Sequence, residues 1–176
     1  VTGISMLEMF QKKPWQVLQL GKMLAELHAQ MHACIFDADV PLQRRKLQNK
    51  IKDAKALPIY LKPKLLDSLE SLPDGDRVCH GDFHPANVLV SEDDSTIIDW
   101  IDASRGNPLA DVARTSIITL GAAASSQIPN AMLKVFVKVF HSAYLNHYFR
   151  LRPGGEDEYL RWLPVVAGAR LNENIP

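Results

Sequence analysis

The chain has 176 residues, 47% of them hydrophobic, which is enough apolar material for one sizeable core but too little length for two domains. Lysine and arginine number 20, as do aspartate and glutamate, so charge gives no support for a nucleic-acid or anionic-membrane partner. No apolar run is long enough to span a bilayer, and nothing resembles a signal peptide. We therefore expect a single cytoplasmic domain, in which Cys34 and Cys79 are free thiols.

The first half of the sequence is predicted to be helical. After Pro14, which the first turn of a helix tolerates, apolar residues recur at spacings of three and four. They predict an amphipathic helix with one buried stripe: Val17, Leu20, Leu24, Leu27 and Met31. Residues 43–55 are basic and weakly patterned, and the leucines between Leu61 and Leu72 indicate a second helix, broken or entered at Pro63.

The centre of the sequence changes from helical to strand-like patterning. Residues 87–90 and 96–100 are short β-branched runs separated by the polar stretch 91–95, which predicts a β-hairpin. Helical patterning then resumes over residues 109–120, with Asp111 in the first turn, where the helix dipole favours a carboxylate.

Two more helices are expected after that. Apolar residues occupy most of the circumference over residues 132–149, which predicts a helix buried on several sides. A last helix begins within residues 156–158 and runs through Val165, with a kink or break at Pro164. The predicted fold class is mainly α with a small β-hairpin, an α+β fold.

Polar side chains cluster around the predicted hairpin. Asp82 lies in the loop before it, Asn87 stands where that loop enters the first strand, and Asp99 ends the returning strand. Phosphoryl transfer needs a carboxylate near the acceptor hydroxyl and metal ligands near the phosphates, all held on a stiff scaffold. A loop that continues into a hairpin provides such a scaffold, so these three residues are the candidate site.

The segment from His80 to Asn87 resembles the H-G-D-x-H-P-x-N catalytic loop of the aminoglycoside phosphotransferase family, a form of the H-x-D-x-x-x-x-N loop of protein kinases. Asp99 occupies the position of the aspartate in the protein-kinase D-F-G motif. Residues 24–28 and 105–113 are also similar to segments of the family, so the resemblance covers nearly all of the chain.

This resemblance implies that residues 1–176 form the C-terminal catalytic lobe of a protein-kinase-like fold. It implies ATP, or GTP, as the donor, Mg²⁺ as the cofactor and a hydroxylated small molecule as the acceptor. Asp82 would act as the catalytic base, while Asn87 and Asp99 would bind Mg²⁺ and, through it, the nucleotide. Acceptors of the family include aminoglycosides, macrolides, choline, homoserine and sugars.

The part of a kinase that grips ATP has no counterpart in this sequence. Neither a Gly-rich loop nor a phosphate-pairing lysine can be assigned, and the chain opens at Val1 without an initiator methionine. We expect an N-terminal lobe to lie upstream of Val1, and we expect the isolated 176-residue chain to be inactive.

Four more residues are interpreted as support for the catalytic loop: His80, His84, Asp102 and Asp111. The histidines would hold the loop through backbone or carboxylate hydrogen bonds. Asp102 could either assist the metal site or cap a turn. Asp111 is expected to start a helix and brace the loop.

Other interpretations stay open at this level. His80, Asp82, His84 and Asp99 could ligate metals in a phosphoesterase or hydrolase, although a further histidine from distant sequence would be needed. A catalytically silent acceptor-binding lobe is also possible, but it would have no chemical need for the complete set of polar site residues.

Two further patterns bear on ligands. His28 and His32 have the spacing of a zinc-binding helix but lack the glutamate of H-E-x-x-H, so they are interpreted as a packed helix surface. An acidic groove for a polycationic acceptor could draw on six residues: Asp37, Asp39, Glu156, Asp157, Glu158 and Glu173.

Overall fold

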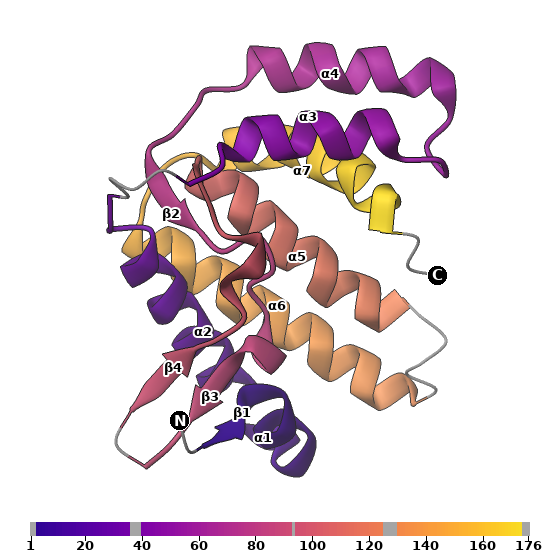
Figure 1. The fold of residues 1–176 in the computed structure, drawn as a ribbon. Helices are drawn as coiled ribbons and strands as arrows, with labels where there is room; N and C mark the ends of the chain where they lie inside the picture. The colour runs from indigo at the N-terminus through magenta and orange to yellow at the C-terminus, as the bar shows by residue number, and fades with distance from the viewer. Residues whose placement is uncertain (1–2, 36–39, 93, 125–129, 174–176) are drawn as a thin grey trace.

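Helices make up most of the computed structural model, which describes residues 3–35, 40–92, 94–124 and 130–173 (Figure 1). The α-helices are α1 (Met6–Lys12), α2 (Val17–Met31), α3 (Gln43–Asp53), α4 (Lys62–Ser71), α5 (Pro108–Ala124), α6 (Ala131–Leu151) and α7 (Glu156–Arg170). The strands are β1 (Ile4–Ser5), β2 (Arg77–Cys79), β3 (Val88–Val90), β4 (Ser95–Ile97) and β5 (Ser104–Gly106). The α+β class predicted from the sequence is confirmed.

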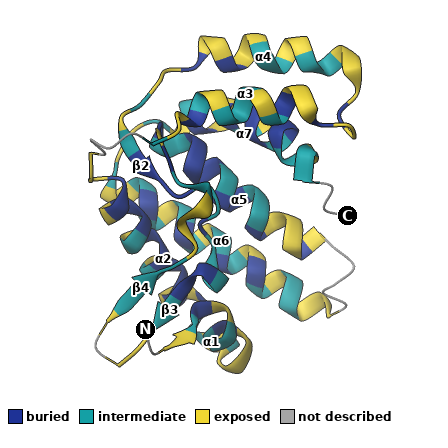
Figure 2. Cartoon of the chain, viewed as in Figure 1, coloured by how far each residue is buried: buried dark blue, intermediate teal, exposed yellow. Residues whose placement is uncertain are grey.

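The core lies between helices that are distant in sequence. Helix α2 packs along α6, α5 lies against both α6 and α7, and α3 and α4 cover α7 (Figure 1). The close approach of α2 to α6 depends on Gly21, because a Cβ at this position would lie 2.7 Å from the carbonyl oxygen of Phe140. Figure 2 shows buried residues concentrated on α2 and α5, whereas α4 is mostly exposed or half-buried.

The strands form two small antiparallel sheets. In the three-stranded sheet β1–β3–β4, Val88 lies opposite Ile97 in the predicted hairpin. A second sheet pairs β2 with β5, so the chain entering the predicted catalytic loop is tied to the segment that follows Asp99. Sequence patterning did not identify β1 or β5, because neither Ile4–Ser5 nor Ser104–Gly106 forms an apolar, β-branched run.

Two predicted helix features need correction. Of the kink or break predicted at Pro164, the break is wrong: helix α7 continues past it, because exposed Pro164 removes only one backbone hydrogen bond while Trp162 and Val165 on either side are buried. Helix α6 is not buried on several sides. Its fully buried residues form one stripe facing α2 and α5: Val137, Phe140, Tyr144 and Tyr148.

Other local predictions can be compared directly. Pro63 lies in the first turn of α4, so the leucine-rich segment is entered, not broken, at this proline. Cys34 is an exposed free thiol and Cys79 a buried one. Among the described residues, no helix combines the length and apolar character needed to cross a membrane.

Candidate active site

The loop between β2 and β3 is held at its start by a buried carboxylate. The backbone N–H groups of His80 and Gly81 donate to the two carboxylate oxygens of Asp111, at 2.7 and 2.8 Å. Gly81 has a φ of 81°, and a Cβ there would lie 2.5 Å from the carbonyl oxygen of Asp102, so the loop requires glycine at this position. Asp111, in the first turn of α5, therefore fixes the backbone just before Asp82.

Two buried histidines converge on the same carboxylate. The Nε2 atoms of His28 and His32 lie 3.2 and 3.4 Å from Asp111 Oδ2, and their Nδ1 atoms lie 2.7 and 2.8 Å from the hydroxyls of Tyr144 and Tyr148. An ionised carboxylate can only accept, so each Nε2 carries the proton and each tyrosine hydroxyl donates to Nδ1. His28 and His32, interpreted from the sequence as a packed helix surface, are completely buried.

This network keeps the carboxylate charged and the imidazole neutral. Burial raises the pKa of Asp111, but hydrogen bonds from His28 and His32 outweigh it and hold the pKa well below its usual value. Burial, with the neighbouring charge of His32, lowers the pKa of His28 to about 3. Burial also lowers the pKa of His32, so both histidines are neutral donors at physiological pH.

The same three residues have the composition of a metal site. His28, His32 and Asp111 each place a ligand atom within 4.8 Å of the others. However, all four ring nitrogens already have hydrogen-bond partners, and both oxygens of Asp111 accept backbone N–H groups. We interpret the group as a satisfied hydrogen-bond network that braces the loop, not as a metal centre.

His80 and His84 are held in single tautomers by backbone groups. His80 Nδ1 accepts from the N–H of Asp82, so its Nε2–H donates to the carbonyl of Ile98 at 3.0 Å and ties the loop to the end of β4. His84 Nδ1 accepts from the N–H of Ala86, so its Nε2–H points at Asp82 Oδ2, 3.3 Å away.

Asp82 is half-buried and ionised. Besides His84, the guanidinium of Arg114 lies 3.4 Å from Asp82 Oδ1, and the side-chain amide of Asn87 donates to the backbone carbonyl of Asp82 at 2.9 Å. The hydrogen bond from His84, with the charges of His84, Arg114 and His80, outweighs partial burial and lowers the pKa of Asp82 to about 2. The carboxylate is thus charged, oriented from two sides and still in contact with solvent.

Asn87 and Asp99 offer oxygen atoms that are not used inside the protein. The amide nitrogen of Asn87 is engaged by Asp82, while its Oδ1 accepts no hydrogen bond from the described residues. Asp99 is exposed and has left-handed backbone angles, φ 64° and ψ 61°, and its carboxylate has no partner in the described part of the chain. Free carboxylate and amide oxygens are the ligands that Mg²⁺ prefers, so these two residues fit such an ion.

The hydrolase interpretation finds no matching geometry. Within the described residues, His80, Asp82, His84 and Asp99 do not bring three ligand atoms together, whereas His28, His32 and Asp111 do. His80 and His84 instead use their ring nitrogens on backbone groups and on Asp82.

This geometry agrees with a comparison at the level of the whole chain. Residues 6–153 match the phosphotransferase enzyme family known as APH. The chain belongs to the APH family. Membership makes it a phosphotransferase in general terms, and it confirms the family resemblance carried by the loop from His80 to Asn87. No curated protein matches the chain.

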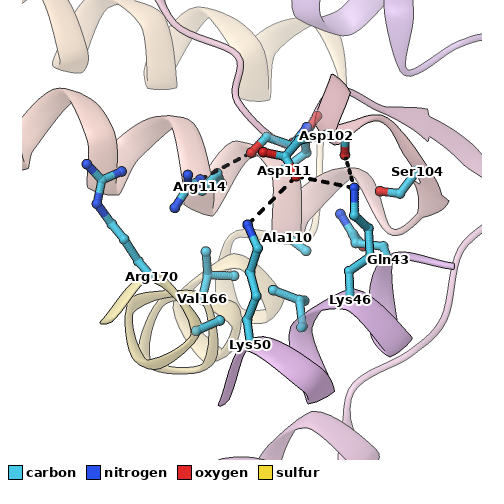
Figure 3. A pocket seen from close by; sticks show the side chains of 13 residues that line it. Gln43, Lys46, Lys50, Asp102, Ser104, Ala110, Asp111, Arg114, Val166 and Arg170 are labelled. Atoms are coloured by element: carbon cyan, nitrogen blue, oxygen red, sulfur yellow. Dashed lines mark hydrogen bonds and ion pairs between the residues drawn. The ribbon is translucent and has the colours of Figure 1, made fainter. Parts of the chain in front are cut away.

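A pocket of this APH-family protein adjoins the loop beside Asp82 (Figure 3). Asp102 lies in it and binds the ammonium group of Lys46 through its carbonyl and carboxylate oxygens, at 2.8 and 3.3 Å, with Lys50 at 3.8 Å. Of the two roles left open for Asp102, turn capping is not seen among the described residues, where its carboxylate instead pairs with two lysines.

Sequence patterning missed most residues of this pocket. Arg114 could have been found, because it lies three residues after Asp111 and therefore shares a helix face with it. Lys46, Lys50 and Arg170 come from α3 and α7, far from the motif in sequence, and no local signal links them to Asp82.

Proposed function

We propose that the protein transfers the γ-phosphoryl group of ATP to a hydroxyl group of a small molecule positioned at Asp82. The observation that supports this most directly is a charged, oriented and solvent-accessible carboxylate on a loop braced from below by Asp111. Positioning and electrostatics supply most of the catalysis in phosphoryl transfer, so a rigidly held carboxylate is the feature such an enzyme needs.

Asp82 would orient the acceptor. Its carboxylate accepts a hydrogen bond from the acceptor hydroxyl, while His84 and Arg114 prevent it from rotating away. The acceptor oxygen forms a bond to the γ-phosphorus as the bond from that phosphorus to the bridging oxygen of ADP breaks. The hydroxyl proton passes to Asp82 and then to solvent. With a pKa of about 2, Asp82 is a weak base, which favours orientation over early proton removal as its main contribution.

Asn87 and Asp99 would hold Mg²⁺ through their free oxygen atoms. When bound, this ion would neutralise charge on the nucleotide phosphates. Asp99 is the one described non-glycine residue with a positive φ. Strained backbone conformations cluster at active sites and ligand clamps, so the conformation of Asp99 supports this role.

The nucleotide also needs cationic contacts on its other side. We propose that a second lobe outside residues 1–176 supplies them, and that ATP or GTP binds between the two lobes. The exposed free thiol of Cys34 is compatible with a reducing compartment such as the cytoplasm, where both nucleotides are abundant.

The test uses the full-length protein, a panel of hydroxylated acceptors and an assay of ADP release. Asp82→Asn is expected to lower turnover about 10²- to 10⁴-fold while leaving nucleotide affinity unchanged. Asp99→Asn keeps a residue that tolerates the left-handed backbone but removes the charge, so it is expected to weaken Mg·ATP binding. Asp67→Asn, on an exposed face of α4, makes the same chemical change away from the site and serves as the control.

Three results would contradict the proposal. Turnover of Asp82→Asn within a few-fold of the control would mean that Asp82 takes no part in the reaction. If the protein is active and calorimetry shows the same Mg·ATP affinity for Asp99→Asn and Asp67→Asn, Asp99 does not bind the metal. A protein that binds acceptors but never turns over ATP would favour the silent-lobe alternative.

A further inference from the structure

The pocket beside Asp82 is lined by cations from three helices. Lys46 and Lys50 extend from α3, Arg114 from α5 and Arg170 from α7, and Figure 3 shows their side chains around one cavity. Arg114 also touches Asp82 and donates from Nε to the carbonyl of Gly81, so the cavity is continuous with the proposed catalytic loop.

Three of these cations already have carboxylate partners. Asp102 pairs with Lys46 and Lys50, and Glu173 pairs with Lys50 at 3.1 Å and with Arg114 at 2.8 Å. Glu173 therefore holds α3 and α5 together at the pocket edge, and its charge is used within the protein.

Arg170 is the exception. It lines the pocket half-buried at the end of α7, yet it forms no ion pair or hydrogen bond with any residue that the structure describes. Burial and the nearby charge of Arg114 lower its pKa, and they outweigh the charges of Glu173 and Asp82, which raise it, so the charged guanidinium is disfavoured where it stands. A bound anion would remove this penalty by pairing with Arg170 and screening it from Arg114.

We infer that this pocket binds an anionic group of the acceptor, so that the substrate is a hydroxylated molecule carrying a carboxylate or a phosphate ester, with Arg170 as its principal contact. The inference rests on the proposed function, because it assigns the acceptor's binding site beside Asp82. A planar guanidinium can donate two parallel hydrogen bonds to either kind of oxyanion, which makes arginine well suited to the task.

The size of the cavity fits an anionic head group. Its volume is about 40 Å³, room for roughly three water molecules. Such a space holds a carboxylate or phosphoryl group, while the rest of the acceptor extends along the open side toward Asp82.

A polycationic acceptor is disfavoured by the same arrangement. Its amino groups would meet Arg170, Arg114 and two lysines at the pocket. Of the acidic residues suggested by the sequence, Asp37 and Asp39 lie outside the described residues, and Glu158 accepts hydrogen bonds from the side chains of Asn107 and Trp162.

The remaining acidic residues do not offer free charge to the pocket either. Glu156 and Asp157 begin α7, roughly 20 Å from Arg170 along the helix axis. Glu173 is paired with Lys50 and Arg114. Helix α7 also lies beyond the segment that matches the APH family, so Arg170 is not part of the match.

The experiment compares acceptors that differ in one substituent, using the full-length protein with Arg170→Gln and Arg170→Lys. A suitable set is D-glucose, D-glucosamine, D-glucuronate and D-glucose 6-phosphate, which differ in a hydroxyl, an amino, a carboxylate or a phosphate group. Arg161→Gln is the matched control, because Arg161 lies on α7 but is exposed and contacts Ser71.

We expect anionic acceptors to be phosphorylated at least about tenfold more efficiently than their amino analogues. Arg170→Gln should raise the acceptor KM by a similar factor without changing the KM for ATP, and Arg170→Lys should restore part of the loss. Comparison of the carboxylate and phosphate acceptors then shows which oxyanion the pocket binds. Preference for amino or neutral acceptors, or an Arg170→Gln variant equal to Arg161→Gln, would overturn the inference while leaving the phosphotransferase proposal intact.

If no acceptor in the set is phosphorylated, a binding measurement tests the anion pocket separately from the phosphotransferase proposal. Inorganic phosphate and acetate are titrated into the protein, and their binding is monitored by NMR of the arginine side chains. Saturable binding that Arg170→Gln weakens and Arg161→Gln does not would support an anion pocket even without turnover. Absence of saturable binding would overturn it.

Discussion

Asp111 and Asp82 are two carboxylates at the same loop, and they differ in their exposure to solvent. The side chain of Asp111 is 1% exposed and accepts from two backbone N–H groups and two histidines. That of Asp82 is 32% exposed and is contacted by His84 and Arg114. Both have a lowered pKa, but only Asp82 keeps room for another hydrogen-bond donor.

The difference shows how this fold separates support from chemistry. A buried carboxylate must use all of its acceptor capacity inside the protein, because unpaired buried charge is strongly destabilising. Such a residue can anchor a loop but cannot bind a substrate. A half-exposed carboxylate costs little to leave without a protein partner, since water donates hydrogen bonds to it until the substrate hydroxyl takes the place of that water. The predictions below test this division, from the largest expected effect to the smallest.

Removing the buried carboxylate should have the largest effect. Asp111→Ala leaves two buried N–H groups of the loop and two buried imidazoles without their acceptor, so the free energy of unfolding should fall by about 3–5 kcal/mol. Urea denaturation monitored by circular dichroism measures this. A loss below about 1 kcal/mol would show that the loop does not depend on Asp111.

The buried histidines should make stability depend on pH. His28 has a folded pKa of about 3, below its unfolded value of 6.5, so the unfolded chain binds an additional proton as the pH falls below 6.5. Folding stability is therefore lost toward acid, at up to about 1.4 kcal/mol per pH unit from this residue. His32, whose pKa is also lowered, acts in the same direction.

His28→Gln tests the pH effect by removing the titrating group. Between roughly pH 5.5 and 4, the slope of unfolding free energy against pH should be smaller in the variant than in the parent. Equal slopes, measured by urea titration across this range, would mean that His28 is not a neutral buried donor.

Asp99 should be a site where stability and function oppose each other. Glycine adopts a φ of 64° without steric penalty, so Asp99→Gly should raise the free energy of unfolding by about 0.5–1 kcal/mol. The same change removes the carboxylate proposed to bind Mg²⁺. Calorimetric unfolding shows whether the substitution raises or lowers stability, and a less stable glycine variant would contradict the strain interpretation.

The smallest effect on folding is expected at the residue with the largest role in the reaction. Asp82→Asn replaces a half-exposed ion-pairing group, and such pairs contribute little, so the free energy of unfolding should change by less than about 1 kcal/mol. Thermal and urea denaturation of Asp82→Asn and Asp111→Ala, measured side by side, compare the two carboxylates directly. A loss as large as that of Asp111→Ala would mean that Asp82 is a structural residue.

The sequence alone was sufficient for features carried by local pattern. Spacings of three and four residues predicted α2, short β-branched runs on either side of a polar stretch predicted the β3–β4 hairpin, and the segment from His80 to Asn87 indicated the APH family. Each of these signals lies within a short stretch of chain, where backbone geometry translates spacing directly into position. The helix that continues past Pro164 is the counterexample, because packing on both sides of the proline outweighed a local rule.

Only the tertiary structure decided which side chains meet. His28 and Tyr144 are 116 residues apart in sequence, and Lys50 and Glu173 are 123 apart, yet each pair is in direct contact. Nothing in the local sequence determines that α2, α5 and α6 will bury two histidines around one carboxylate, or that α3 and α7 will bring their cations to Asp82. Those outcomes depend on how the apolar faces of the helices pack, and the polar groups between them must pair with whatever that packing brings near.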